Sequence, residues 1–63
     1  MRMSLAAARV NKKLTQEQVA QAMGVAKKTV WSWENGRTLP SLEKIEPLCN
    51  LYGLTYDDIE WNA

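Results

Sequence analysis

Residues 14–38, with the sequence LTQEQVAQAMGVAKKTVWSWENGRT, decide the fold of this chain. Thr15 and Gln18 have the spacing of a capping box, which predicts a helix that begins just after Thr15. Gly24 is suited to the left-handed conformation that often follows the last turn of a helix. Helical character resumes over 27–34 and is closed by an Asn-Gly pair, so the stretch predicts two helices joined by a very short turn.

Two helices joined by so short a turn must cross at a steep angle. The crossing needs a small residue on the first helix, and Ala20 meets this need. It also needs apolar anchors, and the stretch supplies them as Val19, Met23, Val25, Val30 and Trp33. This combination predicts a helix-turn-helix motif.

The second helix of the motif divides into two faces at about 100° per residue. Its buried stripe is predicted to hold Thr29, Val30 and Trp33. The opposite arc, free to meet solvent or a ligand, holds Lys27, Lys28, Trp31, Ser32 and Asn35. Lysine, hydroxyl and amide groups at the front of a helix are suitable donors for guanine edges and phosphates.

The rest of the chain is also predicted to be helical, so the fold class is all-α. Further helices are expected over 4–11, over 42–52 with Ser41 as the cap, and over a short segment from 55 to about 61. Strands are disfavoured because no run alternates apolar and polar residues for long. Pro47 lies inside the helix expected over 42–52, where it predicts either a kink, or a helix that begins later or breaks there.

The bulk composition is that of one small domain, expected over 1–63. Cys49 is the single cysteine and histidine is absent, so neither a disulfide framework nor a usual zinc site is expected, and no cofactor. No export signal or membrane span is evident, which predicts a cytoplasmic protein, although a piece cut from a longer chain has the same features. The formal net charge is only +1, so any binding of DNA requires the positive charge to gather on one face.

The chain resembles the Cro/CI-type helix-turn-helix family, the phage-repressor-like regulators also called the XRE family. The resemblance rests on residues 14–24, on Trp-Glu-Asn-Gly-Arg-Thr at 33–38 and on Pro-Ser-Leu at 40–42. It implies a lambda-repressor-like fold, a compact bundle of four to five helices. Two features depart from the family: the Lys27-Lys28 pair stands where glutamine or serine is common, and Pro47 interrupts the fourth helix.

The resemblance also implies roles for individual residues. The residues expected to read bases are Lys27, Lys28, Trp31 and Ser32. Those expected to contact phosphates are Gln16, Asn35, Arg37 and Thr38. Arg9 is expected to pair with Glu34 between the first and third helices.

Several of these residues have a plainer interpretation. Trp31 either contacts a thymine methyl or covers the edge of the core. The pair formed by Arg9 and Glu34 is either partly buried or an ordinary surface ion pair. Cys49 is expected in the core rather than as a redox sensor. The C-terminal part of the chain also carries an apolar group made of Leu54, Tyr56, Ile59 and Trp61. This group either caps the core or forms a dimer contact.

Three classes of function follow from these observations. The favoured hypothesis is a sequence-specific transcriptional regulator, a repressor in most members of the resembling family. The alternative is a protein-interaction module on the same fold, such as an antitoxin or an antirepressor. An enzyme is not expected, because the sequence offers no paired catalytic groups. The partners expected are a double-stranded DNA operator with an inverted repeat and a second copy of the chain, with no membrane, metal or small-molecule ligand.

Overall fold

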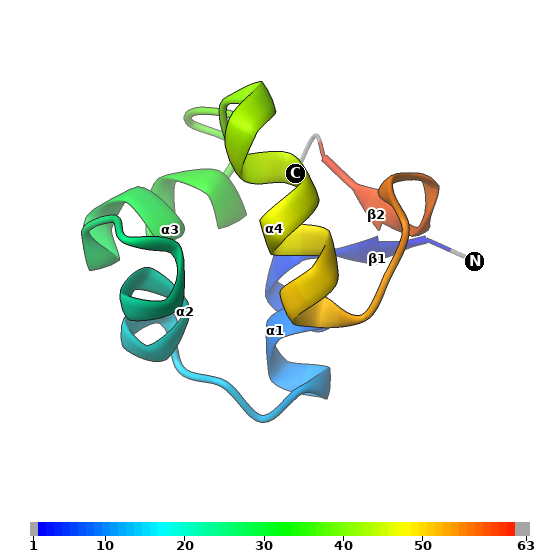
Figure 1. Ribbon diagram of the computed structural model, residues 1–63, viewed down its shortest axis with the longest axis horizontal. Coiled ribbons are helices and arrows are strands. Elements are labelled where there is room, and N and C mark those ends of the chain that lie inside the picture. The colour runs from blue at the N-terminus through cyan, green and yellow to red at the C-terminus, as the bar shows by residue number, and fades with distance from the viewer. Residues whose placement is uncertain (1, 62–63) are drawn as a thin grey trace.

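Four α-helices make up most of residues 2–61, the part of the chain described by a computed structural model (Figure 1). The helices are α1 (Leu5–Asn11), α2 (Gln16–Met23), α3 (Lys27–Glu34) and α4 (Leu42–Tyr52). A 3-10 turn η1 (Tyr56–Asp58) and two short strands, β1 (Met3–Ser4) and β2 (Ile59–Glu60), complete the architecture. The single domain expected over 1–63 includes residues 1, 62 and 63, which lie outside the described part.

The predicted helix-turn-helix is present as α2 and α3. The capping box that starts α2 is complete: the Gln18 backbone N–H donates to Thr15 Oγ1 at 3.1 Å, and the Thr15 N–H donates to Gln18 Oε1 at 2.8 Å. Gly24 ends the helix with a φ of +69°. A Cβ at Gly24 would meet no atom within 4 Å, so the backbone angle alone explains the glycine.

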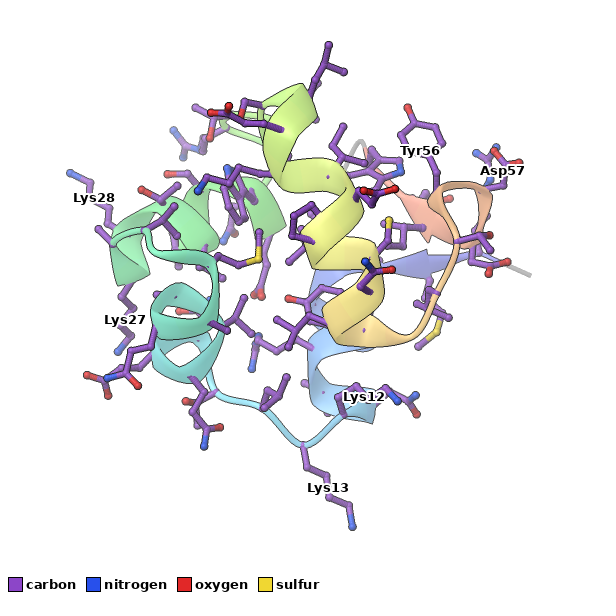
Figure 2. All side chains as sticks on the ribbon, viewed as in Figure 1. Lys12, Lys13, Lys27, Lys28, Tyr56 and Asp57 are labelled. Atoms are coloured by element: carbon purple, nitrogen blue, oxygen red, sulfur yellow. The ribbon has the colours of Figure 1, made fainter. Side chains whose placement is uncertain are left out.

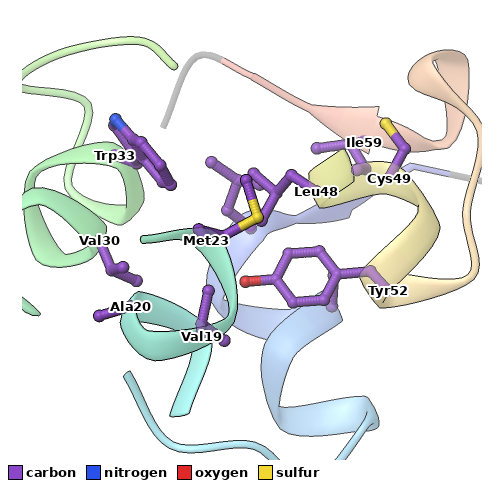
Figure 3. Close-up of a cluster of buried hydrophobic side chains, with 11 residues drawn as sticks. Val19, Ala20, Met23, Val30, Trp33, Leu48, Cys49, Tyr52 and Ile59 are labelled. Carbon is purple, nitrogen blue, oxygen red and sulfur yellow. The ribbon is translucent and has the colours of Figure 1, made fainter. Parts of the chain in front are cut away.

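The core lies where α2 and α3 cross and meet α1 and α4. Figure 3 shows side chains from α2, α3, α4 and β2 converging there. Ala20 is only 4% exposed at the crossing, as predicted. The hydrophobic core cluster consists of Leu5, Ala8, Val19, Ala20, Met23, Val30, Trp33, Leu48, Cys49, Tyr52 and Ile59. Among the expected anchors, Val25 is half-buried and packs against this cluster.

Replacing Ala20 with leucine should overpack the crossing. We expect Ala20→Leu to lower the free energy of unfolding by about 1–3 kcal/mol, because the extra methyl groups enter a filled space. Urea unfolding followed by circular dichroism measures the loss. Ala22→Leu is the matched control, since Ala22 is exposed on the same helix and should change little. Equal midpoints for Ala20→Leu and the parent protein would contradict the crossing described here.

The C-terminal segment differs from the prediction of a helix ending near Trp61. Thr55 does begin a capped turn, with its N–H donating to Asp58 Oδ2 at 3.0 Å, but the turn is 3-10 and ends at Asp58. The chain then extends, and β2 pairs in parallel with β1, Met3 opposite Ile59. The expectation that strands are absent was therefore wrong, because a two-residue strand is too short to produce an alternating pattern.

The fourth helix is continuous from Leu42 to Tyr52 with Pro47 inside it. The alternative that the helix begins later or breaks at Pro47 is therefore wrong. Pro47 has no N–H to donate to the carbonyl of Glu43, so the helix lacks one of its regular backbone hydrogen bonds at this point. Ser41 occupies the N-cap position as predicted, but its side chain makes no capping hydrogen bond. Within residues 2–61, none of the helices has the length and apolar character needed to cross a bilayer.

Candidate nucleic-acid interface

The third helix buries one face and leaves the other open. Val30 and Trp33 are 1% and 4% exposed, whereas Lys27 and Lys28 are exposed. Figure 2 shows both lysines projecting away from the body of the protein. Ser32 lies half-buried at the border of the two faces. The outward arc predicted from the sequence is therefore open to a ligand along the first turn of α3.

An ion pair ties this helix to the first one. Arg9 Nε lies 2.7 Å from Glu34 Oε2, and the two side chains are only 17% and 5% exposed. Arg9 Nη1 also donates to the carbonyl of Leu14 at 2.9 Å, just before α2. The hydrogen bond to Glu34 raises the pKa of Arg9 above its ordinary value. Of the two interpretations of this pair, the partly buried one describes the structure.

Gln16 joins the same network, which the sequence did not indicate. Its Nε2 donates to Glu34 Oε1 at 3.0 Å, so the first residue of α2 is held against the last residue of α3. A recess of about 450 Å³ adjoins the start of α2 and is lined by Arg9, Leu14, Thr15, Gln16, Glu17 and Lys27. The recess brings Lys27 beside the N-terminus of α2, where backbone N–H groups favour an anion.

The turn after α3 is a Schellman motif. Gly36 has a φ of +70°, and its N–H donates to the carbonyl of Trp33 at 3.4 Å. The Arg37 N–H donates to the carbonyl of Ser32 at 2.9 Å, one turn back in the helix. These two bonds satisfy carbonyls that the helix leaves free at its end. They also fix Arg37 directly beside α3.

The side chains of this turn lie next to the outward arc. The guanidinium carbon of Arg37 is 5.8 Å from the centre of the Trp31 ring, and Trp31 is 43% exposed. Asn35 Nδ2 donates to the carbonyl of Trp31 at 2.9 Å, and Thr38 is exposed. Asn35, Arg37 and Thr38, expected to contact phosphates, thus continue the exposed surface that begins at Lys27.

Charge is divided unequally along the chain. Seven of the eight basic side chains precede residue 39, whereas five of the seven acidic ones follow it. Figure 2 places Lys27 and Lys28 on the opposite side of the view from Asp57. The net charge of +1 therefore conceals a basic N-terminal part, which carries α2 and α3, and an acidic C-terminal part. A charge count by halves would have shown this division in the sequence.

The C-terminal apolar group is split between the core and the surface. Ile59 is 1% exposed, because β2 turns its side chain into the core, so for this residue the core interpretation holds and the possible dimer contact is wrong. Leu54 is half-buried against the core, while Tyr56 is 56% exposed and stacks on Trp61 at 5.3 Å between ring centres. These two rings border a cavity of about 390 Å³ lined by Leu39, Pro40, Ser41, Leu42, Ile45, Tyr56 and Trp61.

Cys49 is buried at 7% exposure, and burial raises the pKa of its thiol, which makes the thiolate scarce. The expectation of a core cysteine is confirmed. In the part of the chain that the structure describes, no group of three or more His, Cys, Asp or Glu side chains could hold a metal ion.

Comparison with known proteins gives three matches. Residues 2–61 match the family described as a helix-turn-helix domain. The transcriptional repressor RstR of the cryptic phage CTXphi, from Vibrio cholerae, is 44% identical over 46 residues, 73% of this chain and 41% of the repressor. The HTH-type transcriptional activator BcrR from Enterococcus faecalis is 31% identical over 51 residues, 81% of this chain and 25% of the activator. The chain thus spans less than half of either relative, and no solved structure matches it.

Proposed function

This chain belongs to the helix-turn-helix domain family, and we propose that it binds double-stranded DNA in the major groove as a sequence-specific transcriptional regulator. We further propose that it represses transcription, since the relative with the higher identity is named a repressor. We propose residues 1–63 as one domain that acts in the cytoplasm of a bacterial cell or of a phage-infected host, with no enzymatic activity.

One observation carries this proposal: the exposed arc of α3 lies between two groups of anion-binding donors. On one side is the N-terminus of α2 with its polar recess. On the other is the turn that holds Arg37 and Thr38. A helix in the major groove needs this arrangement, because contacts to phosphates on both sides fix its register while its front residues reach the bases.

We assign base reading to the first turns of α3. Lys28 and Ser32 face the bases in this proposal, and lysine is a suitable donor to guanine O6 and N7. Lys27 shares the recess with Gln16 and is placed to reach a base or the adjoining phosphate. The phosphate contacts come from Gln16, Asn35, Arg37 and Thr38. Gln16 has to share its amide between Glu34 and the phosphate.

Gel-shift titration with a pool of random duplexes, at about 50 mM and 200 mM salt, tests the proposal. A protein that contacts several phosphates should lose affinity steeply between the two salt concentrations. Selection from the same pool should then yield one preferred sequence. The absence of binding at either concentration would contradict a DNA-binding function.

Two substitutions should separate base reading from phosphate binding. Lys28→Ala should weaken binding to the selected duplex by about 1–3 kcal/mol and change the preferred base at one position. Arg37→Ala should lower the affinity for all duplexes by the same factor. It should also reduce the slope of log affinity against log salt concentration by about one. Affinities measured on the selected and on a scrambled duplex distinguish the two results. A changed base preference in Arg37→Ala, with its salt slope intact, would contradict the assignment.

We also propose that two copies bind one operator. One helix reads few base pairs, so two reading helices about 34 Å apart on an inverted repeat supply the remaining specificity. The exposed Tyr56 and the half-buried Trp61 on which it stacks favour a self-contact there. The adjoining cavity, which includes Leu42 at 89% exposure, extends the apolar surface. Such a small patch supports a weak dimer that DNA strengthens.

Stoichiometry tests the dimer. Sedimentation of the protein with its selected duplex should give two chains per site, and Trp61→Ala should weaken the second binding event. One chain per site, bound with full specificity and unaffected by Trp61→Ala, would contradict the dimer while leaving DNA binding intact.

A further inference from the structure

The Schellman turn after α3 brings together two side chains that the sequence assigns to different tasks. Arg37 occupies the second position beyond the helix cap, and Trp31 lies in the turn of helix before the cap. In Schellman motifs these two positions are often joined by a hydrophobic contact. Here a guanidinium lies 5.8 Å from the centre of an indole ring instead, which is within the range of a cation–π interaction.

We propose that Trp31 is a positioning residue for Arg37: its ring holds the guanidinium in the orientation that meets a DNA phosphate, and it does not itself read a base. This inference rests on the proposed function. A guanidinium held over a ring by its flat face keeps its N–H donors, which lie in its plane, free for phosphate oxygens. A free arginine would have to be ordered when DNA binds, whereas a stacked one is already ordered.

The surroundings of Trp31 favour this role. Its carbonyl accepts from Asn35 Nδ2, so the side chain that closes the helix is anchored to the same residue. Trp31 is 43% exposed, whereas Trp33, on the other face of the helix, is 4% exposed and belongs to the core. The reading helix and the phosphate contact after it thus form one unit through Trp31, and a shift of either moves the other.

The contact can be tested without DNA. The ring current of Trp31 should displace the NMR signals of the Arg37 δ protons, and Trp31→Leu should return them to ordinary arginine positions. Trp31→Phe should retain part of the displacement. Arg37 δ signals that are the same in the parent protein and in Trp31→Leu would overturn the positioning role, whether or not the protein binds DNA.

Affinity measurements supply the second test. Trp31→Leu should lower the affinity for the selected and for the scrambled duplex by the same factor, about two- to five-fold. Trp31→Phe should restore much of this lost affinity. In an Arg37→Ala background, Trp31→Leu should have no further effect. An altered base preference in Trp31→Leu, or an undiminished loss in the Arg37→Ala background, would overturn the proposal and make Trp31 a reader of bases. A parent protein that binds no duplex would refute the proposed function, while the NMR result would still decide the contact.

Discussion

Glu34→Ala is expected to lower the free energy of unfolding by about 3 kcal/mol, a large fraction of what a domain of this size has. The Glu34 carboxylate accepts from Arg9 at 2.7 Å and from Gln16 at 3.0 Å while only 5% exposed. Its loss leaves a guanidinium that is 17% exposed without its partner. Chemical denaturation at neutral pH measures the change.

Two further variants separate this cause from a general loss of charge. Glu46→Ala removes an equal charge from an exposed position on α4 and should stay within about 0.5 kcal/mol of the parent. Arg9→Met combined with Glu34→Leu should recover much of the loss, because no buried charge is then left unpaired. A stability of Glu34→Ala equal to that of Glu46→Ala would show that the ion pair contributes nothing.

Ile59→Ala should also lower the free energy of unfolding by about 3 kcal/mol, since it empties part of the core. Ile59 is 1% exposed and lies in β2 opposite Met3 of β1. The loss should appear in thermal or urea unfolding. The self-association of the folded variant should match that of the parent, because Ile59 does not reach the surface.

Tyr56→Ala is the matched control for this prediction. Tyr56 is 56% exposed, so replacing it with alanine should change the free energy of unfolding by less than about 1 kcal/mol. The variant should instead lower the affinity with which the second chain binds the operator. A stable Ile59→Ala that loses only its self-association would restore the dimer role predicted from the sequence and contradict the core position.

The reading motif could be predicted from the sequence because its signals are local. The capping box at Thr15 and Gln18, the left-handed Gly24 and the small Ala20 each specify their own conformation or contact within a few residues. The Cro/CI-type resemblance drawn from these residues is confirmed by the family match over residues 2–61.

The remaining features depend on contacts between distant residues. The pairing of Met3 with Ile59 joins opposite ends of the chain, and strands of two residues leave no periodic pattern. The hydrogen bond from Gln16 to Glu34 likewise spans two helices, so the sequence suggested only a phosphate contact for Gln16. The position of the Arg37 guanidinium over the Trp31 ring follows from the backbone of the turn, which requires knowing that Gly36 has a positive φ.

Chemical-shift mapping with the selected duplex tests the central claim most directly, that the outward arc of α3 and its flanking donors form the DNA-binding surface. The backbone amides that shift should belong to the start of α2, to Lys27, Lys28 and Ser32 in α3, and to the turn at 35–38. The amides of η1 and β2, on the acidic part of the chain, should shift only where a second copy binds. Shifts concentrated in η1 and β2, with α3 unaffected, would contradict the account.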